Sequence, residues 1–326
     1  MRAIRVHQFG GPEALSLDEL PDPVAGPGQV VIRNHAAGVN PVDAYVRAGT
    51  YARLPAVPFI PGWDGAGIVQ SVGADVHRIR VGERVYFSGT TAGRGLGAYA
   101  DMVCCHEVQA CPLPEGLSFA QGAAIGVPYA TAHRALFHRA QTRPGETVLV
   151  HGASGGVGVA AVQLAAAHGC VVIATAGSQS GLELVRAQGA HYVVRHGTAT
   201  SAEEILSITG GRGVDVIVEM LANVNLDRDL GLLALNGRVA IVGNRGRIDI
   251  DPRQIMGKES AVLGVLLWNS SDAELLELHQ LMGPQFAEGV LQPVVGPQFP
   301  LAEAGKAHTA VFEPGARGKI VLNCQQ

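Results

Sequence analysis

Apolar runs of strand length alternate with segments of helical spacing through the second half of the chain. The runs are rich in Val, Ile, Leu and Ala, and they lie at 147–150, 170–174, 192–194, 214–218, 239–242 and 261–267. The helical segments lie around Val159, Leu182, Ile205, Leu226 and Glu274. Because strands that alternate with helices pair side by side in a parallel sheet, this half predicts a doubly wound α/β domain.

The first third of the chain follows another pattern, with short β-like runs punctuated by glycine and proline. The runs lie at 2–9, 29–39, 66–72, 83–87 and 98–103. Since no long helical segment joins them, they predict a compact, barrel-like β domain.

A change of pattern near Ser118 marks the end of this β domain. Helical spacing over 119–139, with Ser118 as a candidate N-cap, predicts a helix that links two domains. From 298 to 322 the chain has one more helix-like and one more strand-like segment, which indicate a return to the first domain. The expected domains are therefore a β-rich one at 1–120 and 298–326 and an α/β one at 121–297.

Composition and charge restrict the classes of function. With 47% hydrophobic and 16% charged residues among 326, the chain can bury two cores. A net charge of −4 gives no general attraction to nucleic acid or to an anionic membrane, so we expect neither partner. The stretch 147–182 holds no charged residue, but glycines interrupt it, and a buried strand–helix–strand unit explains it better than a membrane span. The N-terminus shows no apolar signal core, which predicts a cytoplasmic protein.

The loop from His151 to Gly158 stands between an apolar run and a helical segment, as a dinucleotide-binding turn does. Ala153 takes the first glycine position of the usual G-x-G-x-x-G pattern. Gly155 leaves room for a pyrophosphate, and Gly158 lets the helix pack closely on the strand. The N–H groups of a helix that begins near Gly156 suit the phosphates. The loop predicts a Rossmann dinucleotide site, with an ordinary glycine-rich turn as the alternative.

The residues after the second apolar run indicate which dinucleotide binds. NAD sites place an acid about 20 residues past the glycine loop, but this chain continues as Ala174 to Ser180, and its first carboxylate is Glu183. The N–H of Gly177, the hydroxyl of Ser178 and a nearby cation suit a 2′-phosphate instead. This pattern favours NADPH, unless Ser178 only shapes the turn.

Five blocks along the chain carry a more specific pattern. They read GVNPVDAY at 38–45, QGAAIG at 121–126, HGASGGVG at 151–158, EMLANVNL at 219–226 and KES at 258–260. In these blocks the chain closely resembles the zeta-crystallin family of NADPH:quinone reductases, in the medium-chain dehydrogenase/reductase superfamily. The resemblance implies an α/β protein with a GroES-like catalytic domain, a Rossmann domain and a site in the cleft between them. That family also has alanine at the position of Ala153.

The residues at the metal positions of the superfamily predict that this chain holds no zinc. Its zinc-dependent alcohol dehydrogenases have Cys in place of Asn40 and Gly-His-Glu in place of Gly62, Trp63 and Asp64. The five cysteines also lack the paired spacing of a structural zinc lobe, so we interpret them as reduced thiols. The predicted chemistry is hydride or electron transfer from the nicotinamide.

The resemblance also implies a set of cofactor-binding residues. They are Tyr45, Ser154, Gly155, Gly156, Val157, Gly177, His196, Asn225, Val242, Gly243, Asn244, Arg245, Val265, Leu266 and Leu267. Ser178 joins them from the 2′-phosphate argument. Arg245 follows a strand at the edge where ligands dock in such folds, and His196 suits the adenosine end, although each is also typical of a solvated surface.

The predicted catalytic residues on the substrate side are Asn40, Tyr45 and Tyr51. Asn40 before Pro41 is also typical of a helix N-cap, and the tyrosines could be packing residues. A phenol is flat and donates a hydrogen bond, which suits an aromatic quinone and its oxygen.

The leading prediction is an NADPH-dependent quinone oxidoreductase, by one- or two-electron transfer. One alternative is reduction of the double bond of an enone or enal, and a non-enzymatic one is an RNA-binding or structural role, as in crystallin relatives. The acidic balance argues against strong RNA affinity. The family forms homodimers and homotetramers, and the run 261–268 is a candidate edge strand for such a contact or a buried central strand.

Overall fold

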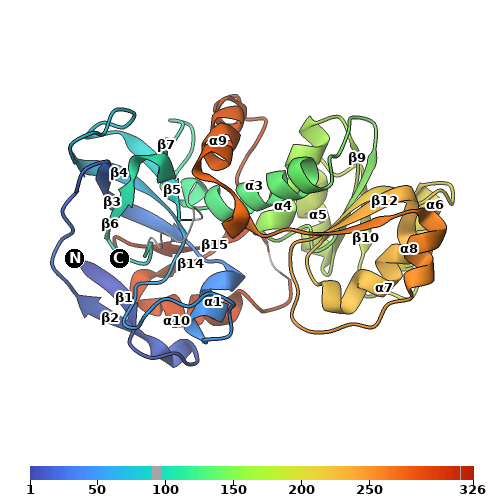
Figure 1. Cartoon of the computed structure of the whole chain (residues 1–326), viewed down its shortest axis with the longest axis horizontal. Helices are drawn as coiled ribbons and strands as arrows, with labels where there is room; N and C mark the ends of the chain where they lie inside the picture. The colour runs from blue at the N-terminus through green and yellow to red at the C-terminus, as the bar shows by residue number, and fades with distance from the viewer. Residues whose placement is uncertain (90–96, 316) are drawn as a thin grey trace. The chain divides into compact units, whose positions relative to one another are not determined.

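The computed structural model describes residues 1–89, 97–315 and 317–326, which form two compact units (Figure 1). The first unit comprises Met1–Val127, Trp268–Glu313 and Gly318–Gln326, and the second comprises Pro128–Leu267 and Pro314–Arg317. The first boundary between the units, after Val127, lies close to the expected one after residue 120. The return to the first unit comes at Trp268 and not at 298, because the helix at 272–287 packs there; the Tyr86 hydroxyl lies 2.9 Å from His279 Nδ1 on that helix.

A six-stranded parallel sheet forms the centre of the second unit. Its strands are β8 (Thr147–Val150), β9 (Val171–Ala176), β10 (Tyr192–Arg195), β11 (Val214–Glu219), β12 (Leu233–Ile241) and β13 (Ala261–Gly264). They pair in the order β10-β9-β8-β11-β12-β13, all parallel. This is the Rossmann strand order, as predicted. The order reverses at β8, and ligands of such sheets bind at the carboxyl end of that point.

Helices join the strands of this sheet. They are α4 (Gly156–Ala167), α5 (Gln179–Ala187), α6 (Ser201–Ile208), α7 (Ala222–Leu232) and α8 (Pro252–Lys258). Strand residues such as Leu149, Ile173 and Ile217 are fully buried. These residues form one apolar core with side chains from α6 and α7.

The single helix expected over 119–139 is three pieces. They are α2 (Phe119–Gly122), α3 (Gly126–His133) and a π-helical turn, η3 (Arg134–Arg139). Ser118 is the N-cap of α2, as predicted, and its Oγ accepts from the Gln121 N–H at 3.2 Å. Pro128 has no N–H to continue a helix from α2 and falls in the first turn of α3, where a proline is tolerated.

Two sheets build the first unit. Strands β1 (Arg2–Val6) and β2 (Leu15–Glu19) form an antiparallel pair. The larger sheet holds β3 (Gln29–Gly38), β4 (Asp64–Val72), β5 (Arg84–Ser88), β6 (Met102–His106), β7 (Ala110–Pro112), β14 (Val295–Pro300) and β15 (Lys319–Asn323). It runs β14-β15-β3-β4-β5-β7, with β6 also on β3, and its pairs are antiparallel apart from β14 with β15.

The predicted β-rich domain is therefore confirmed, with differences in detail. The run expected at 98–103 is displaced to β6, because 98–101 bond singly to other segments, as the Tyr99 N–H does to the Pro61 carbonyl. Sequence patterns did not indicate β2, β7 or β14.

Short helices complete the first unit. They are α1 (Pro41–Arg47), α9 (Asp272–Ala287), α10 (Ala304–Ala310) and the 3-10 turns η1 (Pro12–Ala14), η2 (Glu107–Gln109), η4 (Leu267–Asn269) and η5 (Leu301–Glu303). Side chains of β1, β3, β15 and α10 share one apolar core. None of the helices in the described ranges combines the length and the apolar character needed to cross a membrane.

Candidate functional site

The glycine loop after β8 forms a cradle at the start of α4. Gly152 adopts a positive φ of 56°, and Gly155 is the N-cap of α4, without a side-chain cap among the described residues. A Cβ on Gly158 would lie 2.5 Å from the Gly152 carbonyl oxygen, so only glycine allows this helix to approach the loop. The first N–H groups of α4 and its positive dipole end are thus open to an anion. The loop fits the pyrophosphate of a dinucleotide.

Ser154, Gly177, Ser178 and His196 lie together where β9 and β10 end. A Cβ on Gly177 would come within 2.8 Å of His196 Nε2, and one on Gly181 would lie 3.3 Å from Ser154 Oγ. Ser178 is the N-cap of α5, and its Oγ accepts from the Gly181 N–H at 3.1 Å. Ser178 therefore does shape the turn, and this role leaves its hydroxyl at the helix start where a 2′-phosphate would lie.

The other cofactor candidates lie on loops after β11, β12 and β13. The N–H groups of Val242 and Gly243 donate to the Glu219 carbonyl at 2.9 and 3.2 Å, and the Arg245 N–H donates to Asn223 Oδ1 at 2.8 Å. The Val265 N–H bonds to the Ile241 carbonyl at 2.9 Å. The bonds of Val242, Gly243 and Val265 join the carboxyl ends of neighbouring strands, and that of Arg245 joins its loop to α7. Asn244 and Arg245 are exposed, Leu266 is 43% exposed, and Leu267 is buried.

A buried ionic cluster under the glycine loop was not expected from the sequence. His151 Nε2 lies 3.1 Å from Asp229 Oδ1 and 3.9 Å from Glu219 Oε2, and Asn225 Nδ2 donates to Glu219 Oε1 at 3.0 Å. Burial raises the pKa of Glu219 to about 7 and that of Asp229 to about 6, and it lowers the pKa of His151. In the described chain these three ligand-type residues are the group close enough to share a metal ion. Two polar residues at the carboxyl ends of adjacent parallel strands, His151 and Glu219, were the available signal.

Asn40 belongs to a second buried cluster, in the first unit. It is the N-cap residue of α1, and its backbone N–H donates to Asp43 Oδ2 at 2.8 Å. Its side-chain Nδ2 donates to Asp64 Oδ2 at 2.9 Å, while its Oδ1 accepts from Lys319 Nζ. Lys319 also pairs with Asp64 at 2.9 Å, and all three residues are at most 4% exposed. Asn40 and Asp64 stand where the zinc-dependent alcohol dehydrogenases have Cys and Glu. Here the two side chains hold the ammonium group of Lys319 instead.

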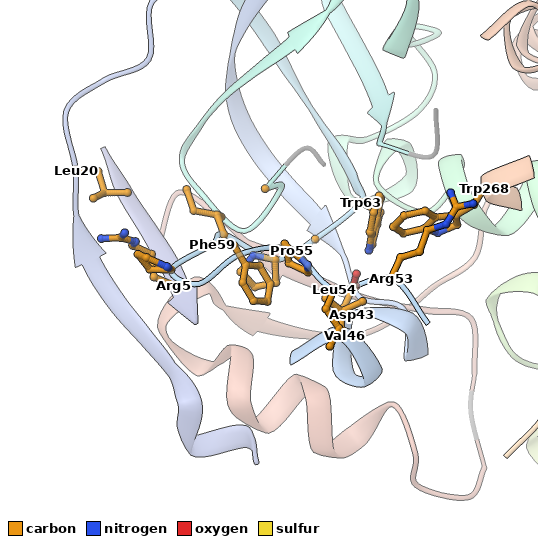
Figure 2. A pocket seen from close by; sticks show the side chains of 15 residues that line it. Arg5, Leu20, Asp43, Val46, Arg53, Leu54, Pro55, Phe59, Trp63 and Trp268 are labelled. Atoms are coloured by element: carbon orange, nitrogen blue, oxygen red, sulfur yellow. The ribbon is translucent and has the colours of Figure 1, made fainter. Parts of the chain in front are cut away.

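An apolar pocket of about 670 Å³ lies beside this cluster in the first unit (Figure 2). Trp63 and Trp268 form one end of it, with ring centroids 4.7 Å apart, and the Arg53 guanidinium lies 5.6 Å from the Trp268 ring. Tyr51 packs on Trp268 at 5.9 Å, whereas Tyr45 packs on Phe312 at 5.5 Å. Tyr51 therefore contacts a ring that lines the pocket without lining the pocket itself, and Tyr45 has a different neighbour.

Asp43 lines the wall of this pocket and was missed as a candidate. Its Oδ2 accepts from the Tyr99 hydroxyl at 3.0 Å, and that hydroxyl lies 3.1 Å from His308 Nε2. Its Oδ1 has no hydrogen-bond partner within the described ranges. Burial raises the pKa of Asp43 to about 7, so this carboxyl group can hold or release a proton near neutral pH.

Known families match both units. Residues 26–115 match the family "Alcohol dehydrogenase GroES-like domain". Residues 156–282 match the family "Zinc-binding dehydrogenase". The quinone oxidoreductases of Rattus norvegicus and Homo sapiens are 48% and 45% identical to this chain, over 99% of it and 97% of their own length.

Solved structures of similar proteins include two quinone oxidoreductases with NADPH. The one from Thermus thermophilus has a TM-score of 0.85 at 35% identity, and the one from Escherichia coli has a TM-score of 0.88 at 28% identity. Each match covers 99% of this chain and 100% of the other. They confirm the expected combination of a GroES-like and a Rossmann domain. The chain therefore belongs to the quinone oxidoreductase family of the medium-chain dehydrogenases/reductases.

Proposed function

We propose that this protein is an NADPH-dependent quinone oxidoreductase. The observation that carries the proposal is the 48% identity to a quinone oxidoreductase over 99% of the chain. The phosphate cradle at α4 and the absence of a carboxylate in the sequence from Ala174 to Leu182 support it independently.

The cofactor side of the proposal rests on the Rossmann unit. The first N–H groups of α4 would hold the pyrophosphate, and Ser178 with the Gly177 N–H would hold the 2′-phosphate. The remaining proposed contacts come from Tyr45, Ser154, Gly155, Gly156, Val157, His196, Asn225, Val242, Gly243, Asn244, Arg245, Val265, Leu266 and Leu267. Bound NADPH would supply a hydride equivalent.

The substrate side of the proposal rests on the GroES-like unit. A flat quinone ring suits the aromatic end of the pocket at Trp63 and Trp268. Tyr51, which packs on Trp268, would donate a hydrogen bond to a quinone oxygen. Asn40 holds the start of α1, which positions both Tyr45 and Asp43. A hydride and one proton convert a quinone to a hydroquinone, and the Asp43 carboxyl group at the pocket wall would deliver that proton.

We further propose a cytoplasmic homo-oligomer. β13 is an edge strand of the Rossmann sheet, and Val262 on it and Leu266 after it are 37% and 43% exposed. An exposed apolar edge of this kind suits an isologous contact with a second copy.

Steady-state assays test the function directly. We expect NADPH oxidation with a series of quinones and little with alkenals of similar size. Turnover of alkenals without turnover of quinones would make the protein an alkenal reductase, and tight binding of neither NADPH nor NADH would remove the enzymatic proposal.

Ser178→Asp tests the choice of cofactor. Aspartate also caps helices, so α5 keeps its N-cap, but its negative charge repels a 2′-phosphate. We expect KM for NADPH to rise at least about tenfold, with little change for NADH, since each 1.4 kcal/mol of repulsion is about a factor of ten. Ser178→Asn is the control, because it keeps the cap without the charge. An equal change for both cofactors would place the 2′-phosphate elsewhere.

A further inference from the structure

The apolar pocket of the first unit extends well beyond its aromatic end. Trp268 and Arg53 lie at one end and Leu20 and Arg5 at the other (Figure 2). Leu54, Pro55, Pro58, Phe59 and Ile60 line the stretch between them, together with Val46 on α1. We call this stretch the apolar trough.

The volume of the pocket exceeds what a quinone ring fills. Pockets of about 300–1,000 Å³ hold ligands of drug size, and this one has about 670 Å³. A benzoquinone ring has only about eight non-hydrogen atoms. A ring packed on Trp63 and Trp268 would leave most of the pocket open to another part of the same substrate.

The chemistry of the trough selects an apolar occupant. Each of the six side chains named for it is apolar. Arg5 at the far end pairs with Asp18 at 3.5 Å, so its charge is already compensated. A sugar, phosphate or peptide in this trough would lose hydrogen bonds to water, and the six apolar side chains could replace none of them. Asp43 is a polar group that lines the pocket beside Val46 and Leu54, and one carboxyl group replaces few of the lost bonds. An alkyl or isoprenoid chain loses nothing of this kind.

The outer wall of the trough exposes apolar side chains to solvent. Residues 52–58 are all exposed, and among them Leu54 and Val57 are 43% and 42% exposed despite their large apolar side chains. A chain bound along the trough would remove apolar surface of Leu54 from water, which is favourable.

We propose that the substrate is a quinone with an apolar side chain, whose ring packs at Trp63 and Trp268 and whose chain lies along the trough toward Leu20. This inference rests on the proposed function, because it assigns the trough to the substrate of that reaction. It adds a substrate class, lipophilic quinones, that the ring site alone does not require.

A series of quinones with one ring and alkyl chains of increasing length tests the inference. The chains run from none to about ten carbons, each assayed with NADPH below its aggregation concentration. We expect kcat/KM to rise roughly two- to fourfold per methylene group over the first several carbons, as burial of each methylene predicts, and then to level off where the pocket ends.

Leu54→Gln tests where the chain lies. Leu54 is 43% exposed, so the variant should fold, and its own kcat/KM for the chainless quinone is the reference for its rates with the longer chains. We expect the variant to lose most of the dependence on chain length. Leu17→Gln is the matched control, because Leu17 on β2 is similarly exposed, at 46%, and does not line the pocket.

The outcomes separate this inference from the proposed function. Turnover of quinones with no dependence on chain length would overturn the inference and leave the function standing. A dependence that survives in both Leu54→Gln and Phe59→Ala would also overturn it, because the chain would then lie elsewhere. Failure to reduce any quinone would instead remove the proposed function.

Discussion

A buried ionic cluster lies in each unit, around Asp64 in the first and around His151 in the second, and the two clusters compensate their charges differently. In the first unit, Lys319 and Asn40 bond to Asp64 Oδ2, while the Val127 N–H and the Ser88 hydroxyl donate to Asp64 Oδ1 at 2.7 and 3.2 Å. Both carboxylate oxygens are thus paired with donors. A cation and a full set of hydrogen bonds offset the cost of burying this carboxylate.

The cluster of the second unit has fewer donors than acceptors. Its two carboxyl groups share one imidazole, and within the described chain Glu219 Oε2 and Asp229 Oδ2 accept no hydrogen bond. Burial therefore raises the pKa of both acids, and a proton held between them would pair their free oxygens. The comparison teaches that the number of donors around a buried carboxyl group decides how far the cost of its burial is offset.

Removal of the Lys319 ammonium group from the first cluster should have the largest effect on stability. Lys319→Met keeps the length of the side chain but leaves Asp64 buried without its cation, so we expect a loss of about 3–5 kcal/mol in the free energy of unfolding. Denaturant titration of both proteins measures it. Lys306→Met is the control, since Lys306 pairs with Glu303 at the surface, and it should cost less than about 1 kcal/mol. Similar small losses in both variants would contradict the comparison.

The pH dependence of the stability of Glu219→Gln should show whether Glu219 in the second cluster takes up a proton. An unfolded glutamate titrates near 4.5 and Glu219 near 7, so the folded chain binds this proton more tightly. The resulting stability is fully present below about pH 4.5 and is lost as the pH rises to about 7. Glutamine resembles the protonated form. At pH 5 we expect the free energy of unfolding of the variant to lie within about 1 kcal/mol of that of the wild type. By pH 8 we expect the variant to have gained about 2 kcal/mol of stability relative to the wild type.

Unfolding curves at several pH values measure this difference. His151, whose pKa burial lowers, contributes a trend of opposite sign in both proteins. This trend is stronger in the variant, because the Glu219 charge that raises the pKa of His151 is gone. Glu183→Gln changes an exposed acid on α5 and serves as the control. A difference between wild type and Glu219→Gln that does not vary with pH would mean that Glu219 is ionised throughout.

Removal of a single hydroxyl group should have the smallest effect on stability. The cost should be larger in the second cluster than in the first. Thr175 Oγ1 lies 3.1 Å from His151 Nδ1, so Thr175→Val leaves a buried ring nitrogen unpaired and should cost about 1–2 kcal/mol. Ser88→Ala should cost less, about 0.5–1 kcal/mol, because Asp64 Oδ1 still accepts from the Val127 N–H. Denaturation midpoints of the two variants measure both costs, and the reverse order would show that the second cluster is the better satisfied one.

Local patterns predicted the elements of the second unit well and those of the first unit less well. The central strands β8, β9 and β11 of the parallel sheet are almost wholly buried apolar runs, which stand out in the sequence. The edge strands β10 and β13 are partly exposed but still rich in apolar residues. By contrast, β2 is half exposed and β14 contains Pro297 and Pro300, so neither has the regular alternation of a typical strand. The helix α9 was expected in the second unit because its spacing shows an apolar face, with Leu275 and Leu278, but not which unit that face packs on.

The sequence by itself determined the glycine loop, the cap at Ser118 and the order of strands and helices. These features depend on residues a few positions apart, whose backbone preferences act within one turn or one strand. The same holds for Asn40 as the start of α1.

Only the tertiary structure decided which distant side chains meet. Gly38 pairs with Asp64 on one side and with Val321 on the other, and this register brings Lys319 to Asn40 across 279 positions of the chain. A Cβ on Gly38 would lie 2.7 Å from the Lys319 side chain, so the glycine makes room for it. Trp268 likewise reaches Trp63 only through packing of the first unit. Such contacts follow from strand pairing between segments far apart in the chain, which no local pattern encodes.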